Sequence, residues 1–223
     1  PQSYEAAPTT ASEKAPADRR IAYFSMEVGV EPELSTYSGG LGVLAGDTLK
    51  AAADLGLPIV AVSLLNAKGY FAQSLDAAGN QLERSDTWDR ARFVRLARGQ
   101  NTTDSEGEGD IQVEVAIEGR SVKVRAWQYD IVGATGFTVP LVLLDSDVEG
   151  NEPWDKELTS YLYGGDDRYR LAQEVVLGVG GARMLQAIGH NHINRFHMNE
   201  GHAALLVLEL LGSSSTASAW NFF

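Results

Sequence analysis

The chain has 223 residues, of which 44% are hydrophobic and 22% charged, the balance of an ordinary globular protein. Its net charge of −12, without a basic patch that interleaves with aromatics, argues against a nucleic-acid partner. The absence of cysteine excludes disulfides, thiolate catalysis and cysteine-ligated metals, and fits a cytoplasmic location. The longest apolar stretches, 57–65 and 203–211, fall short of the roughly 20 residues of a bilayer span, so no membrane partner is expected.

The first part of the chain predicts a strand-helix-strand unit. An apolar run at 21–24 predicts a short strand. Apolar residues at helical spacing over 41–55 predict a helix that ends at Gly56, a residue typical of helix C-termini. The continuous apolar run 58–65 is typical of a buried parallel strand. This order predicts a right-handed β-α-β unit and an α/β fold class.

The middle of the chain predicts an antiparallel β insertion, because short alternating segments are joined there by Gly, Asp and Asn. The expected strands lie near 70–74, 93–97, 111–117, 122–128 and 138–144. Glu118 and Gly119 are expected to form a hairpin turn, and 99–110 a polar loop. Residues 155–161 then predict a short helix.

The longest predicted helix covers 168–188 and contains three glycines, at 178, 180 and 181. Each glycine costs up to about 1 kcal/mol relative to alanine inside a helix, so close packing against another backbone is expected here. Its predicted apolar face consists of Leu171, Val175, Val176, Val179, Met184, Leu185 and Ile188. A strand at 193–198 and a helix at 200–211 are expected to follow.

The most informative motif is the glycine-rich turn Ser38-Gly39-Gly40-Leu41-Gly42, which opens the predicted helix. Glycines let the backbone approach a ligand, and the first turn of a helix offers free N–H groups and the positive end of its dipole. Such a turn suits a phosphate. On these residues alone, a tight strand-to-helix connection without a ligand is an equally good interpretation.

Three motifs carry a family resemblance: IAYFSMEVGV at 21–30, the glycine turn and following strand at 38–65 with KGYFAQ at 68–73, and HMNEGH at 197–202. Together they resemble the N-terminal part of the α-glucan phosphorylases, the glycogen, starch and maltodextrin phosphorylase family, in its shorter branch. The resemblance runs from about residue 20 to residue 211. It implies a disordered leader at 1–19, an incomplete phosphorylase α/β domain at 20–211, and a tail at 212–223 that does not follow the family pattern.

The resemblance implies a partial N-terminal Rossmann-like domain of a two-domain GT-B glycosyltransferase. The parent enzyme would release glucose 1-phosphate from α-1,4-glucans with inorganic phosphate, and a homodimer is compatible with it. Its cofactor would be pyridoxal phosphate, held by a lysine Schiff base in the C-terminal domain. No such lysine can be assigned in this chain, so the fragment alone is expected to be inactive.

The resemblance also implies site residues. It puts Gly39 and Gly40 at the phosphate side of the cleft, with Leu41 beside the reacting glucosyl unit. Unpaired helix N–H groups are preorganised for such a transition state. It assigns His202 to the same glucosyl unit, from a second strand-to-helix junction, where a neutral imidazole suits a hydrogen bond to a sugar.

Two further residues are assigned with an alternative beside each. Glu27 matches an acidic residue that lines the active-site cleft and is a candidate catalytic residue, although a helix cap is the ordinary role of a lone Glu. Asn199 is assigned to substrate binding, with scaffolding of its junction as the alternative, which also applies to His197. The two glycine-marked junctions are expected to meet at one edge of the sheet.

Other chemistries fit less well. His197 and His202 are too far apart to share one helical face, so no metal site is expected. Asp166 and Asp167 are adjacent and point apart, unlike the carboxyl pair of a glycosidase. Asn66-Ala67 replaces an aromatic and a basic residue of the family, and Asn80 a tryptophan, which puts substrate contacts in doubt. A starch-synthase-like nucleotide-sugar glycosyltransferase and a non-catalytic carbohydrate-binding module are the alternative functions.

Overall fold

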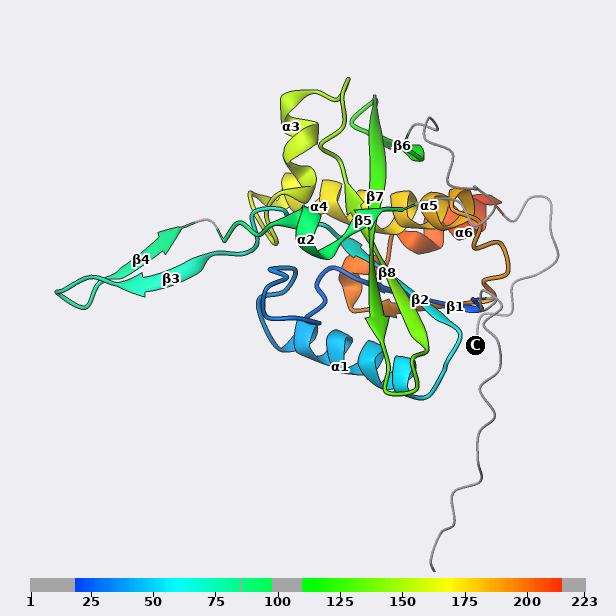
Figure 1. Ribbon diagram of the computed structural model, residues 1–223. Coiled ribbons are helices and arrows are strands. Elements are labelled where there is room, and N and C mark those ends of the chain that lie inside the picture. The colour runs from blue at the N-terminus through cyan, green and yellow to red at the C-terminus, as the bar shows by residue number, and fades with distance from the viewer. Residues whose placement is uncertain (1–18, 85, 98–109, 214–223) are drawn as a thin grey trace, which may run out of the picture.

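The computed structural model describes residues 19–84, 86–97 and 110–213 (Figure 1). Apart from a few residues at their borders, the predicted leader at 1–19, the loop at 99–110 and the tail at 212–223 lie outside this described part. Within the described ranges, no helix is both long enough and apolar enough to cross a bilayer.

A seven-stranded mixed sheet forms the centre of the fold, in the order β5-β7-β8-β2-β1-β9, with β6 also paired to β7. Its parallel strands are β1 (Ile21–Ser25), β2 (Ile59–Leu64), β8 (Thr138–Asp145) and β9 (Arg195–Asn199). The antiparallel strands are β5 (Arg95–Leu96), β6 (Gln112–Ile117) and β7 (Arg120–Val132). The α/β class is therefore confirmed.

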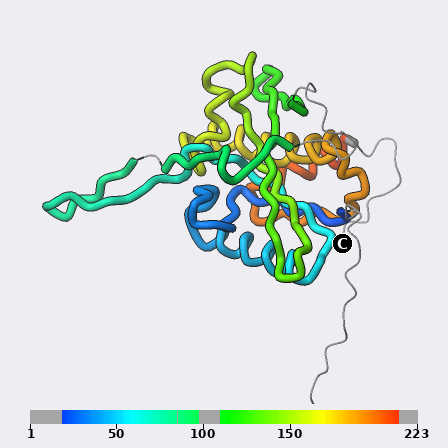
Figure 2. The backbone as a smooth tube through the Cα atoms, in the orientation of Figure 1, coloured from blue at the N-terminus to red at the C-terminus, as the bar shows by residue number. Residues whose placement is uncertain are grey.

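The predicted antiparallel insertion is only partly correct. The strands β5, β6 and β7 are antiparallel, but they extend the main sheet instead of forming a separate one. The strand β8 is antiparallel to β7 and parallel to β2, because its almost fully buried apolar run occupies a central position. A separate hairpin of β3 (Ala72–Leu75) and β4 (Gln81–Arg84) projects from the body (Figure 2).

Helices cover both faces of the sheet (Figure 1). One face is covered by α1 (Gly40–Asp54), and the other by α4 (Asp167–Val175), α5 (Gly181–Ala187) and α6 (Leu206–Ser213). Alternation along β1 separates the two cores, because Tyr23 belongs to the same hydrophobic cluster as Leu49 of α1, whereas Phe24 belongs to that of Met184 of α5. Shorter helices are α2 (Arg90–Phe93), α3 (Pro153–Lys156) and the 3-10 turn Glu157–Thr159.

The predicted β-α-β unit forms almost at the predicted boundaries. The C-terminus of α1 is closed by Gly56 at φ +66°, whose N–H donates to Ala53 O at 3.2 Å, while Leu57 N–H donates to Ala52 O at 2.9 Å. This pair of bonds is the Schellman arrangement, which favours glycine at its left-handed position. The role predicted for Gly56 is confirmed.

The long helix predicted at 168–188 is interrupted by a π-helical turn, Val176–Gly180, between α4 and α5. A Cβ on Gly178 would lie 2.5 Å from Leu206 N, so the predicted close approach of another backbone is confirmed there. The predicted apolar face is wrong at Leu171, which is 56% exposed. Ala172 and Gln173 are buried there instead.

The half-buried His190 follows α5, and burial lowers the pKa of its imidazole to about 4, with the positive charge of Arg19 as a second cause. An unfolded histidine titrates near about 6.5, so between pH 6.5 and 4 only the unfolded chain gains this proton. The free energy of unfolding should therefore decrease as the pH is lowered through that window, and it should level off below pH about 4. Compared with His190→Gln, the wild type should lose about 2 kcal/mol more between pH 7.5 and 4.5 in urea unfolding. Equal losses would contradict the assignment.

Candidate active site

A loop over residues 26–39, and not a direct turn, connects β1 to the glycine motif. The loop folds back onto α1, where Gly29 N–H donates to Gly42 O at 2.8 Å. A Cβ on Gly46 would lie only 1.8 Å from Gly29 O, so this contact requires glycine in the helix. The glycine turn is therefore held in place by its own loop.

The turn itself has open space in front of it. Gly39 is the N-cap residue of α1 and Gly40 its first residue, and a Cβ on either would meet no atom within 4 Å. Packing therefore does not require glycine at these two exposed positions, in contrast to Gly42 and Gly46. The first-turn N–H groups have no acceptor within the helix, and Leu41 is half-buried beside them.

Glu27 is buried, and both of its carboxylate oxygens accept hydrogen bonds. Oε2 accepts from Ser38 N at 2.8 Å and from Gly39 N at 3.2 Å, while Oε1 accepts from the Tyr163 hydroxyl at 2.9 Å. The carboxylate thus occupies the donors that precede α1. The helix-cap alternative is wrong, because α1 has no side-chain cap and Glu27 holds the turn that precedes it. The catalytic role of Glu27 stays a prediction.

The second junction follows β9 and begins as a 3-10 turn, Gly201–Ala203, with α6 starting only at Leu206. The helix predicted at 200–211 is therefore shorter, because Glu200 at φ +68° breaks the backbone before it. His202 lies in this 3-10 turn and is partly exposed.

Contacts across β1 and β9 anchor the second junction. The buried Asn199 donates from Nδ2 to Ser25 Oγ at 3.1 Å, and Ser25 Oγ donates to Glu27 O at 2.6 Å. His197 stacks on Tyr23 with ring centroids 4.6 Å apart. Both contacts are scaffolding, the alternative given for these residues. Substrate binding by Asn199 stays a prediction.

Tyr163, which sequence analysis did not single out, connects the two junctions. Its ring centroid lies 5.3 Å from that of His202, and its hydroxyl reaches Glu27. On α4, Arg170 Nη2 lies 3.2 Å from His202 Nε2. A guanidinium only donates, so Nε2 is the acceptor in this contact. The sequence does carry a signal for a tight turn next to Tyr163, since Gly164 and Gly165 directly precede the cap of α4.

Asp166 and Asn80 have structural contacts, whereas Asn66 is buried. Asp166 caps α4, since its side chain accepts from Tyr169 N at 3.0 Å. Asn80 belongs to the hairpin turn, where its Nδ2 donates to Asp76 Oδ2 at 2.9 Å. Asn66 is fully buried at φ +47°, and its side-chain amide has no hydrogen-bond partner within the described ranges.

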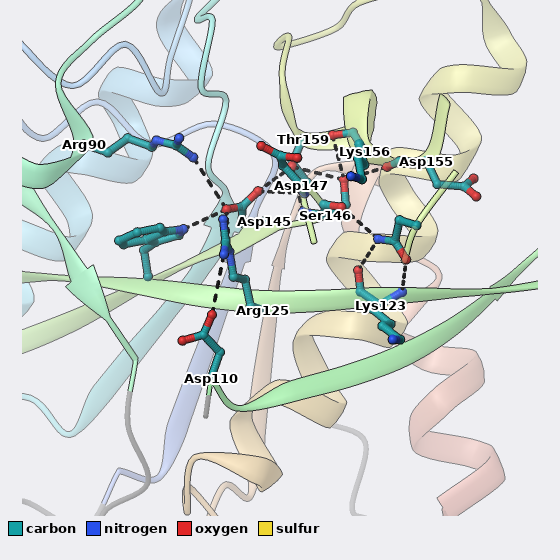
Figure 3. Close-up of polar contacts among 12 residues, drawn as sticks. Arg90, Asp110, Lys123, Arg125, Asp145, Ser146, Asp147, Asp155, Lys156 and Thr159 are labelled. Atoms are coloured by element: carbon teal, nitrogen blue, oxygen red, sulfur yellow. Dashed lines mark hydrogen bonds and ion pairs between the residues drawn. The ribbon is translucent and has the colours of Figure 1, made fainter. Parts of the chain in front are cut away.

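A polar cluster that the sequence did not indicate lies at the end of β8 (Figure 3). The buried Asp145 accepts from Arg125 Nε at 3.0 Å and from Trp127 Nε1 at 2.8 Å. Arg90 lies 3.6 Å away, and the Asp147 N–H donates to Oδ1 at 2.9 Å. The parallel strands β1 and β8 have their carboxyl ends on the same side of the sheet. This cluster therefore lies on the side of the sheet that also carries Glu27.

No protein-family model matches the chain. It is 43% identical over 210 residues to a glycogen phosphorylase of Mycobacterium tuberculosis, an alignment that covers 91% of this chain and 23% of the relative. A maltodextrin phosphorylase of Thermococcus litoralis is 39% identical over 82% of this chain and 21% of the relative. A glycogen phosphorylase of Aquifex aeolicus is 35% identical over 84% of this chain and 26% of the relative.

The chain spans about a quarter of the length of these relatives. Relatives from three organisms carry one of two names, glycogen phosphorylase or maltodextrin phosphorylase. Over this stretch, the chain belongs to the glycogen and maltodextrin phosphorylase family.

Proposed function

We propose that the chain is the N-terminal α/β part of an α-glucan phosphorylase, a glycosyltransferase of the GT-B class that releases glucose 1-phosphate from α-1,4-glucans. The observation that carries this proposal is the chain of contacts from Gly39 through Glu27 and Tyr163 to His202. It links the two motifs that the resemblance assigns to phosphate and sugar. Homodimerisation of the parent enzyme stays a prediction.

The donors proposed for phosphate are the N–H groups of Gly40 and Leu41. The Glu27 carboxylate already accepts from Ser38 and Gly39, so the anion would bind one residue further along, at the first turn of α1. The open space in front of Gly40 allows this approach. His202 would form a hydrogen bond with a sugar hydroxyl.

We expect no pyridoxal phosphate site among the described residues. The described lysines are Lys50, Lys68, Lys123 and Lys156. A Schiff base needs a neutral amine, but the Lys68 amine is hydrogen-bonded to Glu157, which raises its pKa. In the parent enzyme this cofactor would supply acid-base chemistry through its phosphate, from a lysine outside this chain.

Gly40→Ala should weaken phosphate binding at least about tenfold, because the new methyl group stands where the anion would approach the first-turn donors. The folded state should be unchanged or more stable by up to about 1 kcal/mol, since alanine favours the helix. Phosphate titration followed by the amide signals of residues 39–41 measures the first effect, and urea unfolding the second.

Gly212→Ala is the matched control, because a Cβ at that exposed helical position also meets nothing within 4 Å. Phosphate binding should not change in this variant. If phosphate leaves the signals of residues 39–41 of the wild type unmoved, or if ADP-glucose binds there instead, the proposal is contradicted. Release of glucose 1-phosphate by this chain alone, with maltodextrin, phosphate and pyridoxal phosphate, would contradict its expected inactivity.

A further inference from the structure

Tyr163 contacts both junctions from a third segment of the chain, the turn before α4. Its hydroxyl donates to Glu27 Oε1 at 2.9 Å, and Glu27 in turn accepts from Ser38 and Gly39. The ring of Tyr163 lies beside the second junction, with its centroid 5.3 Å from the ring centroid of His202. One side chain therefore contacts the groups that define both turns.

The backbone around Tyr163 is fixed in an unusual conformation. Tyr163 has φ +54°, in the left-handed region where a residue with a side chain is strained by about 1–3 kcal/mol. Gly165 follows at φ +71°, and a Cβ there would lie 2.7 Å from Tyr169 Cβ. The Asp166 cap of α4 then fixes the end of the turn. Such strain persists only where the surroundings hold the residue in place.

The chemistry of the hydroxyl matches a permanent donor. Burial raises the pKa of Tyr163 well above its ordinary value, and the hydrogen bond and negative charge of Glu27 raise it further. The phenol therefore keeps its proton at neutral pH, and the bond to the carboxylate is charge-assisted. Arg170 packs against the same ring at 5.5 Å and also reaches His202.

We infer that Tyr163 is a positioning residue that sets the glycine turn and His202 in fixed relation to each other, acting through Glu27 on one side and through its ring on the other. The consequence for phosphate binding rests on the proposed function. The positioning itself is a property of the ligand-free chain.

The test is Tyr163→Phe, which removes the hydroxyl and keeps the ring. In the ligand-free chain, the amide signals of Ser38 and Gly39 should shift, because Glu27 loses the hydroxyl donor. The imidazole nitrogen signals of His202 should stay in place, because the ring beside them is kept. Phosphate binding should weaken about fivefold, the fold-change of one lost hydrogen bond of ordinary net strength. Tyr169→Phe is the matched control, because its buried hydroxyl donates to the Glu157 carbonyl, away from both junctions.

The control should leave the signals of Ser38, Gly39 and His202 in place, although it also removes a buried hydrogen bond. The inference would be overturned if the amide signals of Ser38 and Gly39 did not shift in Tyr163→Phe, or if they shifted equally in the two variants. A wild type that binds no phosphate but shows the expected shifts in Tyr163→Phe would contradict the proposed function and leave the positioning role supported.

Discussion

Gly46→Ala should unfold at far lower urea concentration than the wild type, with a loss of about 3 kcal/mol or more. The added Cβ would lie 1.8 Å from Gly29 O and 2.6 Å from Gly29 C, separations that real Cβ atoms essentially never show. Both atoms are backbone, so no side chain can rotate away. Either α1 or the loop at 26–39 must move, and the hydrogen bond from Gly29 N to Gly42 O at 2.8 Å would break.

Gly40→Ala serves as the control on the same helix, since its Cβ meets nothing within 4 Å. Its stability should stay within about 1 kcal/mol of the wild type. Circular dichroism during urea unfolding measures both variants. A Gly46→Ala protein as stable as Gly40→Ala would mean that the loop does not pack on α1 as described. Because the same loop carries Glu27, Gly46→Ala should also abolish the bonds to Ser38 and Gly39.

The second large effect is expected for Asp145→Asn, with a loss of about 3 kcal/mol. The carboxylate is buried and accepts on both oxygens, from Arg125, Trp127 and the Asp147 N–H. An amide replaces one acceptor by a donor, so at least one of these N–H groups must face another N–H. The charge of Arg125 also loses its buried counter-ion.

Asp110→Asn is the matched control, because Asp110 pairs with the same Arg125, at 3.5 Å, but its side chain is 31% exposed. An exposed pair of this kind contributes about 0–1 kcal/mol. Urea unfolding of both variants at neutral pH separates the two cases. Equal losses would show that the cluster in Figure 3 is not buried as described.

Much of the fold was predictable because it depends on local patterns. The buried run of β2 and the C-terminal glycine of α1 each carry their own signal, and both form as predicted. The orientation of β8 was not predictable, since an apolar run of that length suits either a parallel or an antiparallel neighbour. The exposed Leu171 was missed because an apolar residue type does not by itself show that a helical position faces the core.

The candidate site was predictable only through the resemblance, and only in part. Glu27, Gly39 and His202 were named from their motifs, and the structure joins them in one chain of contacts. The connecting residue, Tyr163, lies 136 positions from Glu27, and no spacing rule links them. The roles of Gly40, Leu41 and Asn199 in ligand binding stay predictions, because they depend on a ligand and not on the fold.

The π turn between α4 and α5 also constrains how this segment tolerates change in length. Upstream of it, Arg170 faces His202, and downstream Gly181 packs on Phe24 of the sheet. A π turn takes up about one residue more than an α turn does. Loss of one residue from Val176–Gly180 would therefore restore a regular helix and keep α4 and α5 in the same rotational phase. The same deletion outside this turn would rotate α5 by about 100° relative to α4.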